Sequence, residues 1–110
     1  MQGLQKEITN TFFQTLEDLK TKKDLGVFFN DLLTSDELNL LTKRLAIAYW
    51  LHKKRDYENI KNNLKVSLKE IKEVEKKLNT KGYKLALKYM MAEEWSNKWA
   101  LAIKNVGVHM

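Results

Sequence analysis

The sequence contains no cysteine, no proline and only four glycines in 110 residues. Without cysteine the chain has no disulfide, no thiol nucleophile and no cysteine-ligated metal. Without proline, and with few runs of β-branched residues, the chain is expected to consist of helices joined by short turns. The glycines are isolated from one another, so a glycine-rich phosphate loop is excluded.

Length and charge fit one small domain with an anionic partner. A chain of this length is usually a single domain. Small domains bury a smaller fraction of their surface, and a dimer with a shared core would bury more. The net charge is +6 but uneven: four Lys face seven acids in residues 1–42, thirteen Lys and Arg face five acids in residues 43–84, and three Lys face two acids thereafter. The basic middle is therefore expected to meet an anion. Lysine-rich solvated helix faces are the alternative.

No segment indicates a membrane protein or a secreted one. The longest apolar stretch, residues 45–51, is far too short for a membrane span, and the N-terminal residues do not resemble a signal peptide. We therefore expect a soluble cytoplasmic protein.

Apolar residues recur at three- and four-residue steps along most of the chain, which predicts six helices. Thr34 with Glu37, and Ser67 with Glu70, form two capping boxes, and Asp56 is expected to cap the short fourth helix. The third helix is apolar over so much of its circumference that it is expected to be buried on two sides. The predicted helices cover residues 3–20, 23–33, 35–53, 57–64, 67–79 and about 80–104.

Residues 57–78 have the pattern of a helix-turn-helix. Ile60 and Leu64 lie one turn apart, and apolar residues recur at helical steps on the following helix, so the two helices are expected to pack on each other. In a DNA-binding unit of this kind the second helix enters the major groove, and cations just upstream hold phosphates. The residues expected to contact DNA are Lys53, Lys54, Arg55, Lys69, Glu70, Lys72 and Lys76.

A helical hairpin within a bundle would show the same apolar spacing. The outward charges of residues 67–79 also pair with one another, as Lys69 with Glu73 and Glu73 with Lys77 at i,i+4. The spacing alone is therefore compatible with two functions. The protein is either a DNA-binding regulator or a structural or protein-interaction module that has lost the ability to read DNA.

Three pieces of the chain match a known pattern: LLTSDELNLLTKRLAIA, the helix-turn-helix, and LNTKGYKLAL. Through them, residues 28–87 resemble the tryptophan-repressor-like proteins, closest to the branch of small regulators of the YerC/YecD type. The resemblance implies an all-α, six-helix domain over residues 1–110 that forms an intertwined homodimer, with residues 88–110 as a C-terminal helix extension. Two helix-turn-helix units would then read a roughly palindromic site as a sequence-specific transcriptional regulator.

Two residues depart from this family pattern. Lys65 stands where the family commonly has a glycine with left-handed backbone, at a cost of roughly 1 kcal/mol, so the turn is expected to be altered or strained. Glu73 stands where the tryptophan repressor has an arginine that, with one matching Arg44, helps bind the corepressor's carboxylate. Because Glu73 would repel a carboxylate, tryptophan is not expected as corepressor, and no cofactor is predicted. Glu70 and Glu73 also place negative charge on the DNA-reading helix, although glutamate can accept from cytosine.

No pattern indicates catalysis or a metal site. His52 and His109 stand alone, and Ser35 and Ser67 are explained by helix capping. We therefore expect a protein that is not an enzyme.

The C-terminal residues carry an apolar stripe with three interpretations. Packing in the core or in a dimer is favoured, because the stripe continues the last helix in phase with Tyr83 and Leu87. A membrane-surface helix and a partner docking site anchored by Trp95 and Trp99 are the alternatives. The stripe consists of Met91, Trp95, Trp99, Ile103 and Val106.

Overall fold

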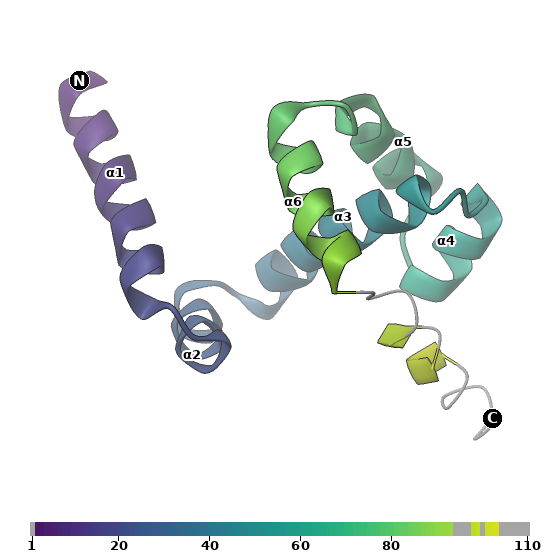
Figure 1. Cartoon of the computed structure of the whole chain (residues 1–110), viewed down its shortest axis with the longest axis horizontal. Coiled ribbons are helices and arrows are strands. Elements are labelled where there is room, and N and C mark those ends of the chain that lie inside the picture. The colour runs from purple at the N-terminus through teal and green to yellow at the C-terminus, as the bar shows by residue number, and fades with distance from the viewer. Residues whose placement is uncertain (1, 94–97, 100, 104–110) are drawn as a thin grey trace. The chain divides into compact units, whose positions relative to one another are not determined.

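The computed structural model describes residues 2–93, 98–99 and 101–103, and these ranges contain helices and turns but no strand. The helices are α1 (Gln2–Leu19), α2 (Lys22–Leu32), α3 (Ser35–His52), α4 (Tyr57–Leu64), α5 (Leu68–Lys77) and α6 (Lys81–Ala92), as Figure 1 shows. The all-α prediction is confirmed, and α1 to α5 begin and end within about two residues of their predicted bounds. None of the described helices is long and apolar enough to cross a membrane.

Helix starts follow the capping residues seen in the sequence. The backbone N–H of Glu37 donates to Thr34 Oγ1 at 3.1 Å, and Glu37 Oε1 accepts from the Thr34 N–H at 2.8 Å. Asp56 Oδ1 accepts from the Asn59 N–H at 2.8 Å and so caps α4. These side chains satisfy N–H groups that have no partner within the helix, which stabilises each start by about 1 kcal/mol.

The chain divides into two compact units, residues 1–39 and 40–110. In the first unit, phenylalanines hold α1 and α2 together: the ring centres of Phe12 and Phe28 lie 6.4 Å apart, and those of Phe28 and Phe29 lie 5.4 Å apart. Neither of these two fully described helices has a buried residue. The pair therefore leaves much of its apolar surface uncovered within one chain.

The core of the second unit surrounds the end of α3. Five consecutive residues, Ile47–Leu51, are buried, and Ile60, Ile71, Val74 and Leu87 from the three following helices complete the cluster. Fully burying one such side chain contributes about 1.5–3 kcal/mol. The expectation that α3 is buried on two sides thus holds for its second half, whose five consecutive residues are all buried.

The first half of α3 is different. Leu40, Leu41 and Leu45 keep 42%, 46% and 37% of their surface exposed. The described residues of the same chain therefore do not cover these three side chains.

The last helix is shorter than predicted. α6 ends at Ala92, where Glu93 adopts φ −89° and ψ −4°, whereas the apolar phase predicted a helix to about residue 104. Residues 98–99 and 101–103 are again helical, and the ring of Trp99 meets Tyr49 and Trp50 at 5.0 and 5.8 Å between centres. Trp99 and Ile103 therefore pack against the core, as the favoured interpretation expected. The expectations for Trp95 and Val106 fall outside the described residues.

Candidate nucleic-acid interface

The helix-turn-helix is held by apolar contacts beneath α4 and α5. Ile60 on α4 and Ile71 on α5 have no exposed surface, and Val66 in the turn and Val74 on α5 are almost fully buried. These side chains belong to the same cluster as residues 47–51. Because α5 is fixed along one side, its opposite side is presented to solvent.

The turn between α4 and α5 contains a left-handed lysine. Lys65 adopts φ 58° and ψ 50°, and its backbone N–H donates to the Lys61 carbonyl. The Val66 N–H donates to the same carbonyl at 3.3 Å. The shape expected of the family's glycine is thus retained with a side chain present, so the turn is strained rather than altered, at a cost of roughly 1 kcal/mol.

Replacing Lys65 by glycine should stabilise the protein. Lys65→Gly removes the clash of Cβ with the backbone but adds flexibility to the unfolded chain, so we expect a net gain of about 0.5–1 kcal/mol in the free energy of unfolding. Urea titration followed by circular dichroism measures it. Lys65→Ala is the control: it removes the same charge but keeps Cβ, and an equal gain in this variant would contradict the strain explanation.

A hydrogen bond joins the start of α4 to the second half of α5. The Tyr57 hydroxyl donates to Glu75 Oε1 at 2.7 Å, between residues 18 positions apart. This hydrogen bond, helped by partial desolvation and by the negative charge of Glu75, raises the pKa of the Tyr57 phenol above its ordinary value of 10.0. The neutral phenol is therefore the form that ties the two helices together.

The Tyr57 contact predicts a pH dependence. Because the pKa of Tyr57 is higher in the folded chain than in the unfolded one, its contribution is fully present below pH 10.0 and is lost as pH rises through the raised pKa. We expect wild type to be more stable than Tyr57→Phe near neutral pH, and the gap to shrink above about pH 10. Urea unfolding of both proteins across this range measures the gap; a gap that stays constant would contradict the assignment.

The outward side of α5 carries lysines. Lys69, Lys72 and Lys76 are all exposed, and the ammonium of Lys72 lies 6.0 Å from the ring centre of Tyr57. The ammonium groups of these lysines are open to solvent. This side of α5 therefore carries the positive charge that a phosphate backbone requires.

Glu70, which was also expected to contact DNA, has a different environment from these lysines. Its Oε1 accepts from the backbone N–H of Ser67 at 3.3 Å and lies 3.1 Å from the Ser67 hydroxyl oxygen, while the Glu70 N–H donates to that hydroxyl at 3.1 Å. The second predicted capping box is therefore present. The carboxylate of Glu70 is used at the start of α5.

The cations upstream of α4 have unequal surroundings. The guanidinium of Arg55 lies 4.4 Å from the ring centre of Trp50, and its Nη1 donates to Asn59 Oδ1 at 2.8 Å. Lys53 lies over Tyr49, 5.8 Å from the ring centre, and Lys54 has left-handed backbone at φ 67° where α3 ends. Arg55 is thus held in place by stacking, whereas the two lysines are exposed.

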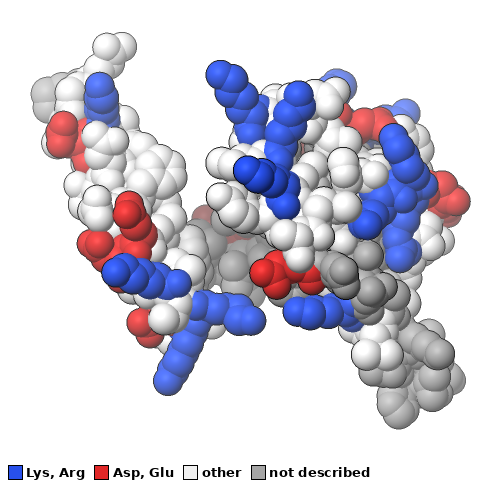
Figure 2. All heavy atoms as spheres, viewed as in Figure 1, with Lys and Arg blue, Asp and Glu red and all other residues white. Residues whose placement is uncertain are grey.

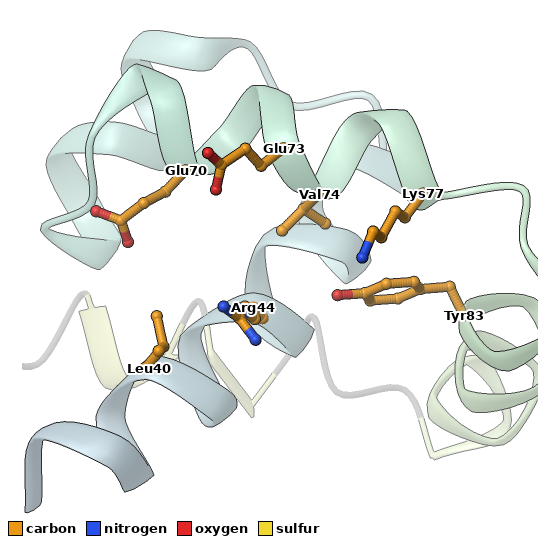
Figure 3. Close-up of a pocket in the computed structure, with 7 residues that line it drawn as sticks. All are labelled: Leu40, Arg44, Glu70, Glu73, Val74, Lys77 and Tyr83. Carbon is orange, nitrogen blue, oxygen red and sulfur yellow. The ribbon is translucent and has the colours of Figure 1, made fainter.

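A small hollow of about 140 Å³ lies between α3 and α5 (Figure 3). Arg44 comes from α3, Glu70 and Glu73 from α5, and Tyr83 from α6, with Leu40, Val74 and Lys77 completing the lining. The structure therefore brings Arg44 and Glu73 to one place, as the resemblance implied. Sequence reasoning did not connect Tyr83 and Lys77 to this hollow, because only the folded chain places α6 beside α5.

Charge is distributed differently over the two units. Figure 2 shows acidic and basic side chains mixed on α1 and α2, whereas Lys and Arg side chains predominate on the visible face of the unit that contains α4, α5 and α6. In the described part of the chain, no three His, Asp or Glu side chains come together as a metal site. The arrangement suits contact with an extended anion.

Capped helices around one buried segment, with a lysine-bearing second helix facing solvent, define an all-α helix-turn-helix protein. The family described as Trp repressor protein matches residues 7–91. This match covers most of the chain, and the chain belongs to that family, whose members are helical DNA-binding regulators. A comparison with curated proteins finds no match.

Proposed function

We propose that this protein is a sequence-specific transcriptional regulator that binds double-stranded DNA as a homodimer and is not an enzyme. The observation that carries the proposal is the exposed lysine side of α5, opposite the buried Ile71 and Val74. α5 would enter the major groove, since a helix fixed on its inner side offers the outer side to base edges. Such a regulator would act in the cytoplasm.

The acids of α5 do not oppose this function. Glu70 and Glu73 both line the hollow toward α3, whereas Lys69, Lys72 and Lys76 do not. Glu75, the third acid of α5, accepts a hydrogen bond from the Tyr57 hydroxyl. Glu70 and Glu75 are thus held by hydrogen bonds within the protein, and Glu73 is exposed one turn from Lys69, whose charge partly offsets its repulsion of a phosphate.

Lys53 and Lys54 are proposed as further phosphate contacts, because both are exposed at the end of α3 just before α4. Arg55 would contribute through its position: its stacking on Trp50 and its bond to Asn59 tie the start of α4 to the core. Phosphate contacts of this kind set the register of the second helix in the groove.

DNA binding is tested by the dependence of affinity on salt. The double variant Lys72→Ala plus Lys76→Ala should bind duplex DNA more weakly, and the slope of log affinity against log salt should fall by about 1.8 in magnitude, since each lost phosphate contact removes about 0.9. Fluorescence anisotropy with labelled genomic fragments at several salt concentrations measures both. Lys22→Ala plus Lys23→Ala on α2 makes the same charge change and should leave the slope unaltered.

Two outcomes would decide against this proposal. If wild type showed no association with any duplex at low salt, DNA reading would be excluded and the helical structural or protein-interaction module would be the better explanation. If the α5 and α2 variants weakened binding equally, net charge rather than α5 would account for the association.

The homodimer is proposed because one chain by itself leaves many large apolar side chains exposed. We expect a twin chain to cover the exposed leucine, isoleucine, valine and phenylalanine side chains of α1, α2 and the first half of α3, because patches of this kind are rare on monomers. Residues 1–110 would then act as one domain completed by the twin. The exposed residues are Leu4, Ile8, Phe12, Phe13, Val27, Leu32, Leu40, Leu41 and Leu45.

Dimerisation is tested by mass in solution. Sedimentation equilibrium at micromolar concentration should give twice the 13.0 kDa of one chain. Leu4→Lys plus Ile8→Lys should shift the mass toward one chain, because a buried unpaired cation is costly. Asn10→Lys plus Gln14→Lys, on the polar side of α1, should remain dimeric. A wild-type mass of 13.0 kDa would contradict the proposal.

Tryptophan is not proposed as a corepressor. The hollow that holds Arg44 also holds Glu73, whose carboxylate would repel that of an amino acid. Its volume of about 140 Å³ is also below the range of about 300–1,000 Å³ usual for ligand pockets. No cofactor is assigned to it.

A further inference from the structure

A second, larger hollow lies away from the outward side of α5, where α3 and α5 end beside α6. Its volume is about 370 Å³, within the range usual for small-molecule sites. Leu51 and His52 come from the end of α3, Leu78 and Asn79 from the end of α5, and Leu87 from α6. All of these residues belong to the same compact unit, residues 40–110.

The floor of this hollow is apolar. Leu51 and Leu87 keep only 9% and 5% of their surface exposed, and Leu78 and Met91 are half-buried against the core cluster. These four side chains are fixed by packing, so the floor is formed before any ligand arrives. An alkyl or aryl group placed on it would gain roughly 25 cal/mol for each Å² removed from water.

The rim is cationic. Lys54 at the end of α3 and Lys84 and Lys88 on α6 line the hollow and are exposed, with His52 beside them. None of the described residues that line it is Asp or Glu. Lys84 and Lys88 are four residues apart on α6, so their side chains lie on the same side of that helix. Their apolar stems can border the floor while the ammonium groups remain in water.

A neighbouring hollow shows that this charge pattern is local. It shares Leu51, Lys54 and Leu78 with the larger hollow, but its lining also includes Asp56 and Glu75. Cations there have carboxylates beside them. In the larger hollow none of the described lining residues is a carboxylate, so its positive charge favours an anion from outside the chain.

We propose that this hollow binds a small amphiphilic carboxylate, with its alkyl or aryl part on the four apolar side chains and its carboxylate among the three lysines. Inorganic anions would lack the apolar contact, and alkylammonium ions would meet like charge. The site is distinct from the hollow that contains Arg44 and Glu73, and it does not depend on DNA binding.

The test uses octanoate and the intact protein. Octanoate should cause saturable NMR shifts in the methyl groups of Leu51, Leu78, Leu87 and Met91. Acetate, which has the same head, and octylammonium, which has the same tail, should cause no such shifts at equal concentration. Octyl phosphate distinguishes a requirement for a carboxylate from a requirement for any anionic head: clearly weaker binding than octanoate supports the carboxylate, and stronger binding overturns that assignment.

Variants of α6 test the rim. Lys84→Glu plus Lys88→Glu should weaken octanoate binding by at least about tenfold, because two attractive charges of about 0.2–1 kcal/mol each become repulsive. Lys84→Arg plus Lys88→Arg should retain binding. Lys6→Glu plus Lys81→Glu changes the net charge equally outside the lining and should stay within about twofold of wild type.

Several results would overturn the proposal. Equal binding of octanoate and octylammonium would show a surfactant effect without charge selection. Equal weakening by the two glutamate variants would show a general electrostatic effect. Methyl shifts confined to the apolar hollow lined by Leu45, Met90 and Trp99 would place the ligand elsewhere.

Discussion

Burial of the second half of α3 is the constraint on which the rest of the structure depends. Residues 47–51 are buried on every side of the helix, so α4, α5 and α6 must each supply apolar side chains around them. The buried indole N–H of Trp50 has no hydrogen-bond partner among the described residues. Leaving such a group unpaired destabilises the fold by about 1–3 kcal/mol. Contacts of the Trp50 ring with Arg55 and Trp99 offset that cost. The helix-turn-helix is thus positioned by the core rather than by its own short helices.

This constraint gives α5 three sides with separate roles. Ile71 and Val74 hold it to the core, Glu70 and Glu73 face the hollow beside Arg44, and lysines remain outward. The acidic residues that weaken a DNA-binding interpretation in the sequence therefore have local explanations. Glu70 stabilises the start of the helix through Ser67, and Glu73 lies opposite the arginine of α3. Charge counted along the chain could not identify these partners, because Arg44 meets Glu73 only when α5 is packed beside α3.

Local features could be predicted from the sequence, and features that depend on distant residues could not. The caps at Thr34, Asp56 and Ser67 followed from spacing of a few residues, since their hydrogen bonds are made within one turn. The resemblance located Lys65, whose left-handed backbone was expected from the family's glycine. The end of α6 at Ala92 was missed, because the apolar phase continues through Trp99 with no proline or glycine to stop it. The bond from Tyr57 to Glu75 joins two helices and had no signal in the sequence.

Lys54 connects the two proposals. It is exposed at the left-handed end of α3, it lies among the proposed phosphate contacts, and it also lines the lysine-rimmed hollow. One ammonium cannot pair fully with two anions at once, so a carboxylate bound in the hollow would reduce its attraction to a DNA phosphate. The coupling between the two sites would then be unfavourable, and DNA would weaken carboxylate binding by the same factor. A small anion bound in the lysine-rimmed hollow would in this way weaken DNA binding, whereas a corepressor strengthens it.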